Sequence, residues 1–177
     1  CSQPTPDQRN NLIEELNLNK FRKNTYTTKF FNIFSLEKIK NDKKLTIYIE
    51  GDGVSWVDRF TPSSNPTPTD PLAFKMALID EGENVIYLAR PCQYVWSDIC
   101  NKDIWTIAQY SSVVLDSYKE IINHLSKTHK EIHLVGYSGG AGITMYLSSI
   151  ENQSIKSIRT IAGNINHNEL SKILNIS

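Results

Sequence analysis

One serine of this chain lies in a pattern that allows a serine hydroxyl to act as a nucleophile. The pattern is Gly136-Tyr137-Ser138-Gly139-Gly140, which follows the apolar run Ile132–Val135 and precedes an amphipathic run. It predicts a buried strand, a sharp turn and a helix, with Ser138 in the strained turn and its hydroxyl above the sheet edge. The Gly139 N–H and the positive end of the helix dipole would face the same point and could stabilise a negatively charged substrate oxygen.

The alternative for these five residues is a glycine-rich turn with an incidental serine, so the surrounding elements have to decide. Strand and helix alternate from Leu45 to Gly163, which predicts an α/β fold with a mostly parallel sheet between two layers of helices. Apolar runs predict strands over 45–49, 84–89, 132–135 and 157–163, with helices from 71, over 105–125 and over 141–150. At the start of the first of these helices, Asp70 can act as the cap and Pro71 fits the first turn. Before them we expect a short helix over 10–18 and one or two strands within 26–36.

Composition limits the classes of function. The chain has 177 residues of which 40% are hydrophobic, enough for one core and too few for two comfortable domains. Lysine plus arginine and aspartate plus glutamate are both 19, so the formal charge is zero and nucleic-acid binding is not expected. We find neither a bilayer-spanning apolar run nor a signal peptide.

The chain begins with Cys1, followed by a polar leader that contains two prolines. This start resembles a mature bacterial lipoprotein, whose first cysteine carries acyl chains and whose next residues form a tether. The resemblance implies membrane association through a lipidated Cys1, on the periplasmic side of the cell envelope. The alternative is a boundary that merely falls on cysteine, with a cytoplasmic location. We therefore expect a leader with a short helix over 1–20 and a single domain over 21–177.

Two further cysteines, Cys92 and Cys100, lie close together in one connecting segment. In an oxidising compartment they would close a small disulfide loop, whereas in the cytosol they would be two thiols. An envelope location favours the disulfide.

A second candidate site element is the turn Gly51-Asp52-Gly53 at the end of the buried strand 45–49. Glycines there let backbone N–H groups approach a ligand, where an open α/β sheet builds its site, although an ordinary turn has the same composition. The proline-rich segment 61–71 is expected to be a loop, either a pocket wall or plain surface. Trp56, Tyr94, Trp96 and Trp105 are candidate pocket aromatics, with simple packing as the alternative.

Several stretches in one order carry a resemblance to a known family; they are 48–53, 66–68, 88–94, 136–140 and 162–164. The chain resembles the α/β-hydrolase superfamily, and more closely a group of uncharacterised bacterial α/β-hydrolases, over most of Tyr48–Asn168. This implies that Ser138 is the nucleophile and that the N–H groups of Gly139 and of the Gly51–Gly53 turn form the oxyanion hole. A small-molecule ester, amide or thioester would be cleaved through an acyl-enzyme, without a cofactor. We predict no metal site, because Glu50 and Asp52 lack a second ligand cluster.

The chain departs from the superfamily pattern after the last predicted strand. In that superfamily the acid and the histidine follow the serine, usually beyond two further strands, but here only His167 and Glu169 remain after residue 163. Three hypotheses follow: a serine hydrolase whose acid and histidine lie in further sequence, a vestigial envelope-anchored binding protein without the chemistry, or an enzyme with His167 as base. We expect the domain to be incomplete after the strand near 158–163, with weak or no activity and an exposed sheet edge that favours self-association.

Overall fold

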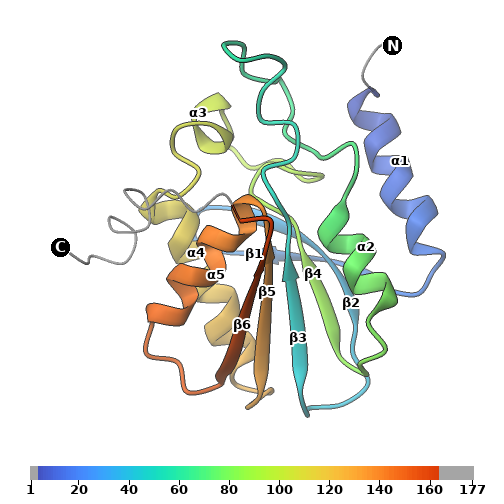
Figure 1. Cartoon of the computed structure of the whole chain (residues 1–177), viewed down its shortest axis with the longest axis vertical. Helices are drawn as coiled ribbons and strands as arrows, with labels where there is room; N and C mark the ends of the chain where they lie inside the picture. The colour runs from blue at the N-terminus through green and yellow to red at the C-terminus, as the bar shows by residue number, and fades with distance from the viewer. Residues whose placement is uncertain (1–3, 164–177) are drawn as a thin grey trace.

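The computed structural model describes residues 4–163, which form a sheet with helices packed on both of its faces (Figure 1). The strands described are β1 (Arg22–Thr27), β2 (Asn32–Lys38), β3 (Leu45–Ile49), β4 (Val85–Leu88), β5 (Ile132–Tyr137) and β6 (Ile155–Ile161). The helices described are α1 (Pro6–Asn17), α2 (Leu72–Ile79), α3 (Lys102–Trp105), α4 (Ser112–Leu125) and α5 (Gly139–Ser149).

The strand order is β1-β2-β4-β3-β5-β6. β1 and β2 are antiparallel, and β2 is antiparallel to β4, whereas β4, β3, β5 and β6 run parallel to one another. Helices α1 and α2 cover one face and α4 and α5 the other (Figure 1). The predicted three-layer α/β architecture with a mostly parallel sheet is confirmed.

The core is built on the register of the three central strands. Ile47 of β3 pairs with Ile86 of β4 on one side and with Leu134 of β5 on the other. All three side chains are buried and pack with α4 residues such as Ile122. β4 is buried on both faces and is a continuous apolar run in the sequence, whereas β3 and β5 also carry half-buried residues. The same pairing brings the carboxyl ends of β3 and β5 together.

The face of the sheet above β5 and β6 is less covered than the rest. A hollow of about 660 Å³ lies there, and its lining includes Tyr48, Val135 and Arg159 from adjacent positions of β3, β5 and β6. Among the described residues, α2 packs mainly on β3 and β4 and contacts β5 less.

The helix predicted over 105–125 is wrong in its first part. Asn101 accepts a hydrogen bond from Asp103 N and caps α3, which already ends at Trp105. The carbonyl of Asp103 then accepts bonds from both Thr106 N and Ala108 N, and the helix resumes only at Ser112. The apolar spacing continues across this break, so periodicity alone does not reveal it.

Helix α1 begins earlier than predicted, because Thr5, directly before Pro6, is the N-cap residue and forms a capping box with Gln8 in the first turn. Arg9 is buried and donates to the carbonyl oxygens of Asn65 (3.0 Å) and Thr67 (2.9 Å), which fastens α1 to the proline-rich loop. The helix therefore packs against the sheet domain.

Candidate active site

Ser138 occupies a sharp turn between β5 and α5. Its backbone has φ 49° and ψ −118°, a left-handed region that costs free energy for any residue with a β-carbon. The turn is held by hydrogen bonds from Ser138 N to Ile161 O and from Ala141 N to Ser138 O, both 2.9 Å. The structure thus maintains a strained serine at the carboxyl edge of the sheet, a geometry that lifts a hydroxyl clear of its neighbours.

The glycines that flank Ser138 are required by close backbone packing. A β-carbon at Gly136 would lie 2.5 Å from Gly140 O, and one at Gly140 would lie 2.6 Å from Glu50 O. Helix α5 therefore rests backbone to backbone on the ends of β3 and β5, which fixes the position of its first turn next to Ser138.

The Gly51-Asp52-Gly53 turn lies beside the serine. A β-carbon at Gly51 would come within 3.0 Å of Ser138 Cβ, so these two residues are neighbours across the ends of β3 and β5. Gly53 has φ +62° and packs against the Pro66 carbonyl, which leaves no room for a side chain. The structure therefore brings together Ser138, Gly139 and the turn that the resemblance implied.

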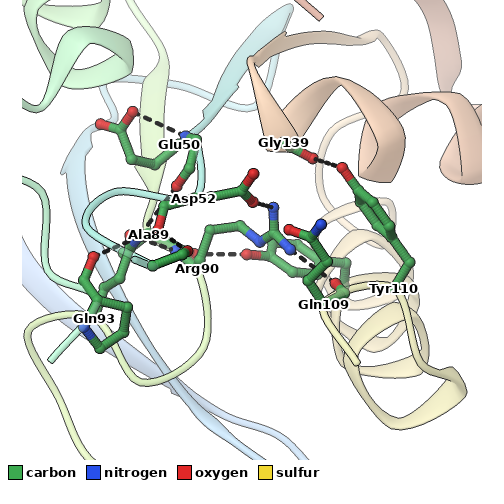
Figure 2. A network of polar contacts seen from close by, with 12 residues as sticks. Glu50, Asp52, Ala89, Arg90, Gln93, Gln109, Tyr110 and Gly139 are labelled. Carbon is green, nitrogen blue, oxygen red and sulfur yellow. Dashed lines mark hydrogen bonds and ion pairs between the residues drawn. The ribbon is translucent and has the colours of Figure 1, made fainter. Parts of the chain in front are cut away.

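An ion pair lies directly beneath this turn (Figure 2). Arg90 Nη1 donates to Asp52 Oδ1 at 2.8 Å, and Arg90 Nη2 donates to Gln109 O at 2.8 Å. With its amide nitrogen facing Asp52, Gln109 donates to both carboxylate oxygens, at 2.8 and 3.2 Å. Burial by itself lowers the pKa of Arg90, but its interactions with Asp52, Tyr118 and Tyr110 together outweigh burial and leave that pKa raised, so the guanidinium stays charged.

Tyr110 connects the same group to the first turn of α5. Its hydroxyl donates to Gly139 O at 3.0 Å, and its ring lies 5.5 Å from the Arg90 guanidinium (Figure 2). Asp52 contacts Gly139 from the other side, since a β-carbon at position 139 would overlap the carboxylate. The sequence reasoning assigned no role to Arg90, Gln109 or Tyr110; the one available signal was an arginine directly after a buried strand.

Glu50 supports the turn from the side of α2. Its side chain is buried, and its Oε1 accepts hydrogen bonds from Gly51 N (2.9 Å) and Ala73 N (3.3 Å). The predicted side-chain cap by Asp70 is absent, because Pro71 is the N-cap residue and Glu50 takes over that function across the fold. Burial raises the pKa of Glu50 to about 7, although these backbone hydrogen bonds oppose the shift.

A cleft of about 500 Å³ opens over Ser138 and the turn. Trp56 lines it, as does Trp105, but Tyr94 and Trp96 do not. The Tyr94 ring packs 4.8 Å from that of Phe34, and Trp96 packs at 5.7 Å against Trp105 from outside. Of the predicted pocket aromatics, the structure places Trp56 and Trp105 in the cleft, whereas the segment after β4 turns Tyr94 and Trp96 away from it.

The histidines of the described part lie away from Ser138. His133 is five residues earlier in β5, about 16 Å at ~3.3 Å per strand residue. Its Nδ1 lies 2.6 Å from Ser157 Oγ, and its Nε2 lies 3.0 Å from Glu131 Oε1. His129 binds the Lys43 carbonyl, and His124 makes an edge-to-face contact with the ring of Tyr26. The predicted base His167 and its partner Glu169 lie outside the described residues.

Cys92 and Cys100 are joined by a disulfide. Between them, the buried Gln93 accepts a hydrogen bond from Arg90 N and donates to Gly51 O, both at 3.0 Å. The disulfide loop therefore contributes to the support of the Gly51 turn.

Three remaining predictions concern lipidation of Cys1, metal binding and membrane-spanning segments. Cys1 lies outside the described residues. Between residues 4 and 163 there is no group of three or more side chains suited to hold a metal ion. None of the helices in that range has the length and apolar character needed to cross a bilayer.

Comparison with known proteins identifies the fold. No family model and no curated protein matches the chain. A serine hydrolase from Cycloclasticus zankles is 17% identical with a TM-score of 0.54, covering 81% of this chain and 46% of that structure. A membrane phospholipase A from a bacterium is 17% identical with a TM-score of 0.53, covering 89% and 45%. A thioesterase domain from the curacin biosynthetic pathway is 16% identical with a TM-score of 0.54, covering 88% and 53%. The chain spans about half the length of these structures, and it has the α/β-hydrolase fold.

Proposed function

We propose that this chain carries the nucleophile and the oxyanion-binding half of a serine hydrolase for small-molecule carboxylic esters, amides or thioesters. The observation that carries the proposal is the strained Ser138, held at the start of α5 within contact distance of Gly51. Similarity of fold to serine hydrolases, a phospholipase and a thioesterase supports the same class of reaction.

In this reaction Ser138 Oγ attacks the substrate carbonyl carbon and the bond to the leaving group breaks, which leaves an acyl group on the serine. Water then attacks that acyl-enzyme and releases the acid. The carbonyl oxygen carries negative charge at each step, and we assign its stabilisation to the Gly139 N–H and an N–H of the Gly51–Gly53 turn. A base must take the hydroxyl proton and pass it to the departing alcohol, amine or thiol. We place this base outside residues 4–163, with His167 as one candidate.

A second candidate function is a binding protein that keeps the fold without the chemistry. One observation favours it: within residues 4–163 no histidine contacts Ser138. Such a protein would retain its ligand when Ser138 is replaced by alanine.

The serine hydrolase and the binding protein are distinguished by extracting the native protein from its source cells and labelling it with a fluorophosphonate. We expect modification of Ser138, lost in Ser138→Ala and retained in Ser157→Ala. Ser157 is the matched control, because it is the serine hydrogen-bonded to a histidine in the described part. Loss of labelling only in Ser157→Ala would move the chemistry to Ser157, His133 and Glu131, and absence of labelling would favour the binding protein.

We further propose that Cys1 is acylated and holds the protein in the bacterial envelope. The Cys92–Cys100 disulfide supports this location, since such bonds persist in oxidising compartments. The intact mass of the detergent-extracted protein tests the proposal: acyl groups on Cys1 are expected, and an unmodified cysteine would refute it.

A further inference from the structure

The carboxylate of Asp52 lies where a negative charge would oppose the proposed reaction. It contacts Gly139 so closely that no side chain fits between them, and its side chain is 31% exposed. Gly139 is also the residue whose N–H would bind the oxyanion. Two like charges about 4 Å apart in a partly buried site repel strongly enough to slow a reaction by about 100-fold or more. An ionised Asp52 without a counter-charge would therefore impair this site.

Arg90 supplies that counter-charge from below. Its side chain is only 6% exposed, and it donates to Asp52 Oδ1 at 2.8 Å (Figure 2). A buried guanidinium is always charged and holds a carboxylate with fixed geometry, which a surface lysine would not do.

Arg90 also joins the two parts of the proposed oxyanion hole mechanically. Through Asp52 it contacts the turn after β3, and through its second nitrogen it binds the carbonyl of Gln109. The next residue, Tyr110, packs near the guanidinium and donates to Gly139 O. The Arg90 side chain, which follows β4, is thus connected both to the turn and to the first residue of α5.

We infer that Arg90 is a positioning residue that neutralises Asp52 and fixes Gly139 and the Gly51–Gly53 turn in the arrangement that binds an oxyanion. The inference rests on the proposed function, because it assigns Arg90 to the same site. It separates two effects of the arginine, charge compensation and geometry, which different substitutions can test.

The first test is a double-mutant cycle in the full-length protein, with acylation of Ser138 by p-nitrophenyl acetate as readout. Arg90→Gln is expected to slow acylation by about 100-fold, since Asp52 then keeps an uncompensated charge. Adding Asp52→Asn to Arg90→Gln is expected to recover about tenfold of that loss, because the repelling charge is gone. A merely structural arginine predicts a double variant no faster than Arg90→Gln, and that outcome would overturn the inference.

Two further variants control this cycle. Arg22→Gln removes an arginine whose side chain is 80% exposed and pairs with Glu37 far from the cleft, so acylation should stay unchanged. Arg90→Lys keeps the charge but not the second hydrogen bond, and an intermediate rate is expected. Should Arg90→Gln fail to fold, Arg90→Met, which also removes the positive charge, replaces it with and without Asp52→Asn.

The second test needs no chemistry at all, so it separates failure of this inference from failure of the proposed function. In the full-length protein labelled with [¹⁵N]glycine, Arg90→Gln or Arg90→Lys should shift the amide signals of Gly51, Gly53 and Gly139 together. Gly82, in the exposed turn before β4, should stay in place. If the wild-type protein does not acylate, the proposed function fails while shifts at all three amides still support the coupling. An unmoved Gly139 would overturn it.

Discussion

The carboxylate of Asp52 and the Cα of Gly139 are in contact, although the two residues belong to different strand ends. A β-carbon at position 139 would overlap Asp52, which Arg90 holds from below at 2.8 Å. The glycine after Ser138 is therefore needed for the carboxylate of the neighbouring turn, in addition to any role of its own N–H.

Gly139→Ala tests this contact. The new methyl group must displace Asp52 from Arg90, which is expected to destabilise the fold by about 1–3 kcal/mol and to reduce labelling of Ser138. Urea unfolding and fluorophosphonate labelling measure the two effects. Gly82→Ala is the control, because its β-carbon would meet only the end of the Asp80 side chain, and it should change neither. Wild-type stability in Gly139→Ala would show that Asp52 moves away without cost.

Local patterns predicted the elements around the site well. The apolar run 45–49 coincides with β3, and the glycine spacing around Ser138 predicted the strand, the turn and the helix. These signals work because the core-facing residues of a central strand must be apolar and because a sharp strand-to-helix turn requires glycines.

The polar network beneath the turn could not be predicted in the same way. Pairing of Arg90 with Asp52 follows from the order β4-β3-β5, which places strands distant in sequence side by side. Likewise Glu50 caps α2 in place of Asp70, which looked like the cap in the sequence. Tyr94 has φ 62°, which no local sequence pattern predicts. This conformation lies in the segment that turns the Tyr94 ring away from the cleft.

Glu50→Gln should remove a pH dependence of stability. Burial raises the pKa of Glu50 to about 7 from an ordinary value of 4.5, so the folded state binds the proton more tightly than the unfolded state. Protonated Glu50 therefore contributes to the free energy of unfolding. This contribution is fully present below the pKa that Glu50 has in the unfolded chain, and it is lost as pH rises through about 7. Between about pH 5 and about pH 8 the free energy of unfolding should fall by on the order of 2–3 kcal/mol in the wild type.

Urea titrations at the two pH values measure this fall, and in Glu50→Gln it should largely disappear. Glu81→Gln, a change of charge at an exposed position, serves as control and should keep the wild-type fall. If Glu50→Gln keeps it too, the buried carboxyl is not the group that titrates.

Reduction of the Cys92–Cys100 disulfide should loosen the Gly51 turn as well as lower stability. Opening so short a loop is expected to cost about 2–3 kcal/mol. Because Gln93 lies within the loop and binds Gly51 O, exchange of the Gly51 amide hydrogen should also accelerate. Urea unfolding and hydrogen exchange with and without reductant give the two readings. The Cys92→Ser/Cys100→Ser variant should resemble the reduced protein and should not respond to reductant. A Gly51 amide that stays protected from exchange in this variant would contradict the coupling between the disulfide loop and the Gly51 turn.

The outer edge of β6 should make the isolated 177-residue chain self-associate. In the part of the chain that the structure describes, β6 pairs with β5 on one side, and the apolar Ile161 near its end is 40% exposed. An open strand edge offers unpaired N–H and carbonyl groups to another copy, and a lysine at such an edge opposes pairing. Sedimentation velocity should therefore show association that increases with concentration and is weakened by Ile161→Lys. Ile79→Lys adds the same charge to a more exposed isoleucine on α2 and should leave association unchanged. Equal weakening by both variants would mean that net charge, and not the β6 edge, controls the association.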